Sequence, residues 1–313
     1  MTLPHRIAVA SNTFSNDETL RTALSERFPD AYFNRTGRIL AGAELVEFLA
    51  NGSAAVMGLE KIDAVLLDAC PQIKVIAKFG VGMDNVDLPG CAERGVKVLS
   101  TPGVNAFAVA ELTLGLMIAV ARRIAITTHY LKIGQWNRNG GVQVFGKKVG
   151  LIGLGHVGKQ TAKVLQSVGC SILAHDILDL SAYGAAHSIE CCSLDDVLAQ
   201  SDFVSLHVPL TPLTRSMIRR PQLQKMKPTA FLINTARGGI VDEEDLADAL
   251  RDGTIAGAAT DVFAEEPPRN ARLLGMETFI GTAHVGGNSR EAIHAVGMAA
   301  VNNLLAHFGA ERP

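Results

Sequence analysis

The chain has 313 residues, which is enough for about two domains of ordinary size and excludes a small disulfide-stapled scaffold. Its 48% hydrophobic residues and 30 glycines are typical of a folded, glycine-punctuated α/β protein and not of a disordered chain. Lys and Arg total 29 against 31 Asp and Glu, so the net charge of −2 indicates no surface for nucleic acid. The five cysteines form no Cys-x-x-Cys pair, and their odd count favours a reducing compartment.

The N-terminal residues 1–10 lack the basic segment, apolar run and cleavage site of a secretory signal. The longest apolar stretch, residues 104–126, contains Glu111, Arg122 and Arg123, which are costly in hydrocarbon. We therefore expect one long buried helix there, no membrane span, and a cytoplasmic protein.

Short β-rich runs alternate with helical patterns along the chain, which indicates parallel sheets built from βαβ units. The first four runs are 7–10, 54–58, 74–79 and 97–100. Thr101-Pro102-Gly103 then interrupts the pattern, and we place a domain border there. Six further runs predict a doubly wound sheet: 148–153, 171–176, 202–208, 230–235, 256–262 and 279–284. Helices are expected to start at Ser193, at Asp242 and at Asn288, the last with Glu291 as a capping box.

The strongest local motif is Gly153-Leu154-Gly155-His156-Val157-Gly158, between an apolar strand pattern and a helical pattern. Glycines at these three positions permit a tight turn, close approach of the backbone to a pyrophosphate, and close packing of helix on strand. The motif therefore predicts a dinucleotide site, the alternative being an ordinary glycine-rich βα turn.

Asp176 strengthens the dinucleotide interpretation because it follows the next strand, 23 positions after Gly153. A carboxylate there binds ribose hydroxyls and repels a 2′-phosphate, and the next residues, Ile177 and Leu178, provide no cation for one. We expect NAD rather than NADP, the alternative being a carboxylate that only caps the strand end.

Arg237, Glu266 and His284 each follow a late strand, where open α/β sheets bind their ligands. Together they suit reversible hydride transfer to a carbonyl: the imidazole exchanges a proton, the carboxylate orients the imidazole, and the guanidinium binds a substrate carboxylate. Surface ion pairs and a helix-flanking histidine are the alternatives for the same residues. The remaining histidines have no metal-ligand spacing, so no metal is expected.

A further cluster, Lys78 to Asn85, places two glycines after a strand of the first third. Its backbone amides are suited to an anion, although a turn capped by Asp84 or Asn85 explains the pattern as well.

These segments together resemble the D-isomer-specific 2-hydroxyacid dehydrogenase family, near its phosphoglycerate dehydrogenase-like branch. The matching segments are KFGVGMDNVDL (78–88), the glycine motif with Asp176, SDFVSLHVPLTP through LINTARGG (201–239), and DVFAEEP through GTAHVGG (261–287). The resemblance implies a Rossmann dinucleotide-binding domain of residues 102–285, inserted into a smaller flavodoxin-like α/β substrate domain of residues 1–101 and 286–313.

The resemblance also implies roles for individual residues in an NAD-dependent enzyme of EC 1.1.1 type. Arg237 would anchor the carboxylate and keto oxygen of a small 2-oxo acid, and Glu266 would pair with His284, the acid/base. Val81 and Gly82 would offer amides to the substrate carboxylate, with Asn105 at the edge of the cleft. The residues lining NAD would be His156, Val157, Asp176, Val208, Thr235, Ala236 and Asp261, besides Gly153, Gly155 and Gly158.

Two points concern the substrate and partners. Glu60 stands where some phosphoglycerate enzymes place a basic residue for the substrate phosphate, which weakens that substrate, although Lys61 could compensate. Members of the family are usually homodimers, and the 104–126 helix is the expected interface. The alternatives are an NAD-regulated co-repressor-like interaction protein and a phosphite dehydrogenase; a formate enzyme would have Gln in place of Glu266.

Overall fold

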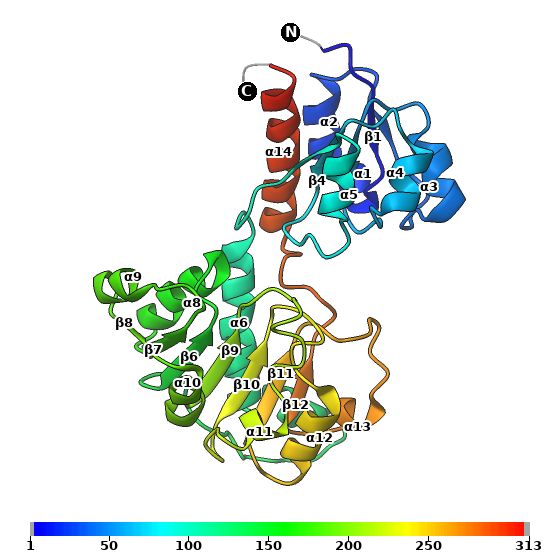
Figure 1. Cartoon of the computed structure of the whole chain (residues 1–313). Helices are drawn as coiled ribbons and strands as arrows, with labels where there is room; N and C mark the ends of the chain where they lie inside the picture. The colour runs from blue at the N-terminus through cyan, green and yellow to red at the C-terminus, as the bar shows by residue number, and fades with distance from the viewer. Residues whose placement is uncertain (1–2, 310–313) are drawn as a thin grey trace. The chain divides into compact units, whose positions relative to one another are not determined.

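The computed structural model describes residues 3–309 and divides into two compact units (Figure 1). The first unit contains the described residues up to Asn105 together with those from Arg290 onward, and the second is Ala106–Ser289. Both borders lie four residues later along the chain than positions 101 and 285, where the sequence analysis placed them.

The first unit is a five-stranded parallel sheet in the order β2-β1-β3-β4-β5, with helices on both faces. This strand order is that of flavodoxin. Its elements are β1 (Ile7–Val9), α1 (Asn12–Asn16), α2 (Glu18–Ser25), β2 (Tyr32–Phe33), α3 (Gly42–Leu49), β3 (Ala54–Met57), α4 (Ala64–Ala69), β4 (Val75–Lys78), α5 (Leu88–Glu93), β5 (Lys97–Leu99) and α14 (Arg290–His307).

Alternate residues along β1 serve two cores, as the period of a strand requires. Ile7 and Val9 pack with α1, α2 and the C-terminal helix α14, whereas Ala8 packs with α3, α4 and α5. The last helix of the chain therefore completes one face of the sheet that the N-terminal third builds.

The second unit is a seven-stranded parallel sheet, which Figure 1 shows in the order β8-β7-β6-β9-β10-β11-β12. The strand order reverses between β6 and β9, the usual place of ligand binding in doubly wound sheets. Its elements are α6 (Ala106–Ala121), α7 (Ile124–Lys132), β6 (Lys148–Ile152), α8 (His156–Ser167), β7 (Ser171–His175), α9 (Ser181–Ala186), β8 (Ile189–Cys191), α10 (Leu194–Gln200), β9 (Phe203–Leu206), α11 (Arg220–Leu223), β10 (Phe231–Asn234), α12 (Glu243–Arg251), β11 (Gly257–Thr260), α13 (Ala271–Leu274) and β12 (Phe279–Gly281). The predicted doubly wound α/β fold is confirmed.

The structure corrects three expectations about elements. The second sheet has seven strands rather than six because β8 was missed, as was β2 in the first sheet. The expected single helix at 104–126 is two helices, because Arg123 adopts a left-handed conformation (φ 54°) between α6 and α7. A helix capped by Asn288 would begin at residue 289, but the last helix begins one residue later, at Arg290.

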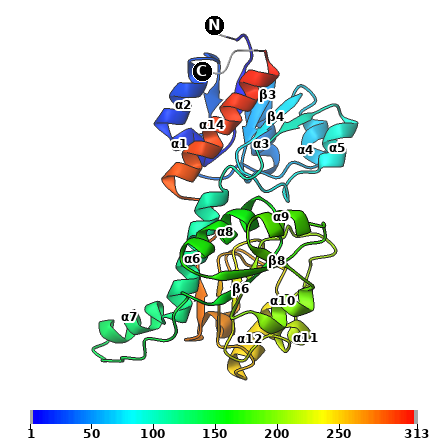
Figure 2. The same cartoon turned by 90° about the vertical axis from the view of Figure 1, so that its left-hand side faces the viewer.

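The helices of the second unit cover both faces of its sheet. Helices α6 and α8 contribute to one core, while α10, α11 and α12 contribute to the other. Helix α7 buries no residue, and Figure 2 shows it with the following segment away from the sheet. Within residues 3–309, no helix is both long and apolar enough to cross a membrane.

Candidate active site

The glycine motif forms the turn between β6 and α8, at the reversal point of the second sheet. Gly153 has a φ of 97°, and a Cβ added to it would lie 2.7 Å from the backbone oxygen of His207. A Cβ on Gly158 would lie 2.1 Å from the oxygen of Gly153, so helix α8 packs on the turn closely enough to require glycine. The predicted tight turn and close helix packing are both present.

Gly155 is different, because a Cβ built on it would meet nothing within 4 Å. It is the N-cap of α8, a helix of 12 residues, and no side chain caps that end. The space beside Gly155 is therefore open, and the first amides of α8 lie next to it at the positive end of the helix dipole. This arrangement fits a pyrophosphate, which needs an uncrowded backbone approach and N–H donors.

Asp176 directly follows β7 and lies beside the turn. One carboxylate oxygen accepts from the Leu154 amide at 2.7 Å and the other from the Leu178 amide at 3.0 Å. Asp176 also lines a cavity of about 220 Å³ with Asp179, and the described lining contains no Lys or Arg. Hydrogen bonds from Ser181 hold the pKa of Asp179 below its usual value, so this second carboxylate stays ionised. The cavity is therefore negatively charged and suited to ribose hydroxyls.

Other residues predicted to line the cofactor follow the neighbouring strands. Val208 comes shortly after β9, and Thr235 and Ala236 directly follow β10. The Thr235 hydroxyl is held at 2.8 Å by that of Thr113 on α6. The open turn, the free helix end and the acidic cavity thus fit a bound dinucleotide on the same edge of the sheet.

His284 and Glu266 form the predicted pair. The Nδ1 atom of His284 lies 2.9 and 3.1 Å from the two carboxylate oxygens of Glu266. Their side chains are 48% and 40% exposed, so both remain accessible to a ligand. Because Glu266 engages Nδ1, the other ring nitrogen, Nε2, is available for proton exchange.

The turn that carries His284 is held by Asp261, which is 1% exposed and directly follows β11. Its carboxylate accepts from the amides of Val285 and Gly286, both at 2.8 Å, and from the Thr282 hydroxyl at 2.6 Å. The His284 amide also donates to the Asp261 carbonyl at 2.8 Å. These bonds maintain a φ of 52° at His284, a conformation that is strained for a residue with a side chain.

Arg237 lies after β10, and its guanidinium donates to the carbonyl of Ala236 at 2.7 Å. The Asn234 side chain organises this loop by donating to the Arg237 carbonyl at 2.9 Å and accepting from the Ala236 amide at 3.1 Å. A Cβ on Gly238 would lie 1.8 Å from the Phe263 oxygen, so the loops that carry Arg237 and Glu266 touch. The sequence offers one signal for this role of Asn234, because an Asn at a strand end is a common turn former.

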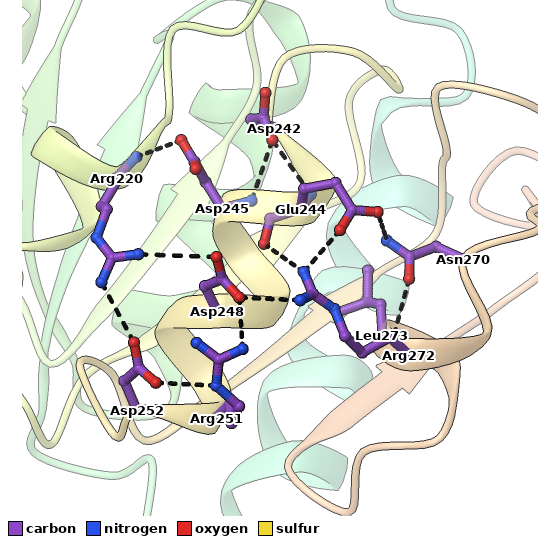
Figure 3. A network of polar contacts seen from close by, with 10 residues as sticks. All are labelled: Arg220, Asp242, Glu244, Asp245, Asp248, Arg251, Asp252, Asn270, Arg272 and Leu273. Atoms are coloured by element: carbon purple, nitrogen blue, oxygen red, sulfur yellow. Dashed lines mark hydrogen bonds and ion pairs between the residues drawn. The ribbon is translucent and has the colours of Figure 1, made fainter.

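The loop between β11 and α13, which carries Glu266, is fastened to α12. The Phe263 amide donates to Glu266 at 3.1 Å, and the Ala264 amide donates to Glu243 at 2.7 Å. Figure 3 shows the adjoining network, in which Asn270 donates to Glu244 at 2.9 Å and Arg272 bonds both Glu244 and Asp248. Charged side chains of α12 thus hold both ends of the loop.

His207 directly follows β9 and has a polar environment. Its Nε2 lies 2.9 Å from the Ser205 hydroxyl, while its Nδ1 is buried without a partner among the described residues. Burial lowers the pKa of His207 to about 4, so the ring is neutral near pH 7.

In the first unit, Val81 and Gly82 lie in the loop after β4 and are partly exposed, and Asn105 is the last residue before α6. Glu60 is 1% exposed and its carboxylate accepts from the Gly58 amide at 2.6 Å. Glu60 is therefore turned inward and does not present an acidic group to a ligand, which corrects the reasoning about a substrate phosphate. Lys61 is exposed and pairs with Asp63 at 2.8 Å.

Comparison with known proteins places this geometry in a family. Residues 114–286 match the family model described as "D-isomer specific 2-hydroxyacid dehydrogenase, NAD binding domain". A glyoxylate reductase of Thermofilum pendens is 43% identical, over 81% of this chain and 77% of the relative. A hydroxypyruvate reductase of Thermotoga maritima is 40% identical, over 81% and 84%.

Two further comparisons concern length and fold. A D-3-phosphoglycerate dehydrogenase of Methanocaldococcus jannaschii is 38% identical over 82% of this chain, but the match spans only 50% of that relative. The solved TT0316 protein of Thermus thermophilus is 33% identical and superposes with a TM-score of 0.83, covering 98% of both chains. The chain belongs to the D-isomer-specific 2-hydroxyacid dehydrogenase family and is an NAD-dependent oxidoreductase.

Proposed function

We propose that this enzyme interconverts a small 2-oxo acid and its D-2-hydroxy acid, with His284 as the acid/base. The observation that carries the proposal is the direct contact between His284 and Glu266 at the ligand-binding edge of the sheet that also carries the glycine turn. Such a pair matches the proton exchange that carbonyl reduction requires.

NADH, when bound, would supply the hydride, and the chain supplies the groups that act on the substrate. In reduction, His284 Nε2 gives a proton to the keto oxygen as that oxygen gains negative charge. Glu266 keeps the imidazole oriented and stabilises its protonated form. Arg237 binds the substrate carboxylate and keto oxygen, because a guanidinium offers two parallel donors. In oxidation, His284 takes the hydroxyl proton.

In the same proposal, residues of the first unit act on the substrate through backbone donors. The amides of Val81 and Gly82 bind the substrate carboxylate, and Asn105 borders the substrate. Gly153, Gly155, Gly158, His156, Val157, Asp176, Val208, Thr235, Ala236 and Asp261 serve the cofactor.

Glyoxylate and hydroxypyruvate are the substrates we propose to try first, because the two reductases reported above act on them by name.

The test is an NADH-consumption assay at 340 nm with a panel of glyoxylate, hydroxypyruvate, pyruvate and 3-phosphohydroxypyruvate. His284→Ala should lower turnover by orders of magnitude and leave NADH affinity near the parent value. His294→Ala, an exposed histidine on α14, is the matched control. Unchanged turnover in His284→Ala would remove His284 from the mechanism, and silence across the panel would favour a binding function.

We also propose that the enzyme is a homodimer in which a second copy covers α7 and the segment after it. Three large apolar side chains are exposed there: Leu131 at 58%, Ile133 at 54% and Trp136 at 79%. Large apolar side chains grouped on a projecting segment usually meet a partner. Light scattering after size exclusion should give twice the chain mass, and Trp136→Glu should reduce it toward one chain. A parent protein that elutes as one chain at assay concentration would contradict this.

A further inference from the structure

A buried polar cluster joins the loops that follow β3 and β4 in the first unit. Glu60 is 1% exposed and Lys78 is 5% exposed, and Met57 pairs with Lys78 in the sheet, so both loops start side by side. Buried charged groups are costly unless other groups bind them, which makes their partners informative.

These partners converge on Gly58. The Glu60 carboxylate accepts from the Gly58 amide at 2.6 Å, and Lys78 Nζ donates to the Gly58 carbonyl. The Asn85 side chain donates to the same carbonyl at 3.0 Å and to the Glu60 carbonyl at 2.6 Å. Burial raises the pKa of Glu60, while the Gly58 amide and the Lys78 charge act in the opposite direction. We call Glu60, Lys78 and Asn85 the Glu60 cluster.

The loop of residues 79–85 is anchored at both ends by these contacts. The Phe79 amide donates to Met57 at 2.8 Å, and the Asn85 carbonyl accepts from Ile62 at 2.8 Å, besides the bonds of the Asn85 side chain. Val81 and Gly82 lie between the anchors. A Cβ on Gly80 would lie 3.7 Å from Lys78 Nζ, so a buried cation lies beside this loop.

We propose that the Glu60 cluster positions the loop of Val81 and Gly82 to bind the carboxylate of the substrate, and that Glu60, Lys78 and Asn85 are positioning residues that do not touch it. The inference rests on the proposed function, because it needs those amides to bind the substrate. A loop that is already ordered loses less conformational entropy when its amides bind an anion, and Lys78 adds a favourable potential. The cluster therefore acts on substrate affinity.

The test compares Glu60→Ala, Asn85→Ala and Glu60→Gln with a matched control, Glu44→Ala, whose carboxylate forms an exposed pair with Arg38 at 2.6 Å. The KM and kcat for the best 2-oxo acid of the panel, the Kd for NADH, and hydrogen exchange of residues 79–87 are measured for each. Circular dichroism and thermal melting establish that each variant folds; Asn85 is only partly buried, so Asn85→Ala serves if Glu60→Ala does not fold.

Glu60→Ala loses a buried hydrogen bond and Asn85→Ala loses two partly buried ones, so each should raise the KM for the 2-oxo acid about tenfold and should speed exchange in the loop. Their Kd for NADH should equal that of the parent, because the glycine turn belongs to the other unit. The KM and the loop exchange of Glu60→Gln should lie between those of the parent and those of Glu60→Ala, because the amide oxygen of Gln still accepts from the Gly58 amide. Glu44→Ala should behave as the parent.

The outcomes separate this inference from the proposed function. If His284→Ala abolishes turnover while Glu60→Ala and Asn85→Ala keep the parent KM and loop exchange, the positioning role is wrong and the function stands. If both variants raise the Kd for NADH as much as the KM, the effect is a general loss of structure, and the inference also fails. Retained turnover in His284→Ala overturns the proposed function itself.

Discussion

The glycine turn allows steric demands of the fold to be separated from demands of the cofactor. A Cβ on Gly158 would lie 2.1 Å from the Gly153 oxygen, whereas a Cβ on Gly155 would meet nothing within 4 Å. Gly115, on the exposed side of α6, has the same open surroundings as Gly155 but lies far along the chain from the turn. Alanine at these three positions therefore adds one methyl group to a crowded site, an open site at a helix N-terminus, and an open control site.

The expected magnitudes follow from these distances. Gly158→Ala needs a backbone shift of more than 1 Å to reach ordinary contact at 3.4 Å, and should lower the free energy of unfolding by about 1–3 kcal/mol, as other overpacked sites do. Gly155→Ala should leave that free energy near the parent value but raise the Kd for NADH at least about tenfold, or about 1.4 kcal/mol, because the methyl group obstructs the pyrophosphate. Gly115→Ala should stabilise α6 by about 0.5–1 kcal/mol.

Urea unfolding followed by circular dichroism measures the first quantity, and the fluorescence of NADH on titration with protein measures the second. If Gly155→Ala binds NADH as tightly as Gly115→Ala does, the cofactor does not use the open space beside Gly155. If Gly158→Ala is as stable as the parent, the close packing of α8 on the turn does not require glycine.

Three further predictions concern the charge of the cofactor cavity, a buried histidine and the network of Figure 3. Asp176→Ala should improve NADPH binding relative to NADH only in part, because Asp179 keeps a negative charge in the cavity; unchanged selectivity in fluorescence titrations would remove Asp176 from ribose recognition. Burial lowers the pKa of His207 from 6.5 to about 4, so between these values the unfolded chain binds a proton that the folded chain does not. The free energy of unfolding from urea titrations should therefore fall by up to about 3 kcal/mol as the pH drops through this window, and His207→Gln should flatten the fall; an equally steep profile in the variant would contradict the assignment. Arg272→Ala should lower the same free energy by less than about 1 kcal/mol, because its partner Glu244 is exposed and its partner Asp248 is partly exposed, and a loss above about 3 kcal/mol would show that the network is stronger than exposed ion pairs.

Most of the strands that the sequence predicted correctly have buried cores, although the edge strands β5 and β12 are partly exposed. All residues of β3, β4, β9, β10 and β11 are buried, so each appears as an apolar run whose ends lie within two residues of the predicted ends. The missed strands β2 and β8 are short and lie at sheet edges, with partly exposed side chains. Their pairing depends on neighbours far along the chain, which local patterning does not record.

The backbone conformation of single residues and the direction of single side chains could not be predicted from the sequence either. The apolar run at 104–126 does not show that Arg123 adopts a left-handed conformation, and this single residue divides the predicted helix. The family resemblance places Glu60 where some phosphoglycerate enzymes have a basic residue for the substrate phosphate, whereas the structure buries Glu60. The Gly58 amide that binds its carboxylate is local, but Asn85, which binds its carbonyl, and Lys78, which binds the Gly58 carbonyl, come near only when β3 and β4 pair.

The placement of Arg237, Glu266 and His284 was predictable because β10, β11 and β12 are neighbours in chain order and are all parallel. Asn234 pairs with Thr260, and Thr260 pairs with Gly281, so the three strands end in register. Arg237 and His284 each follow their strand by three residues, whereas Glu266 follows by six. That offset requires its loop to fold back, and the Phe263 amide bound to the Glu266 carboxylate at 3.1 Å accomplishes this. Parallel topology thus brings the three residues to one edge, but the contact between imidazole and carboxylate depends on a loop whose shape only the structure supplies.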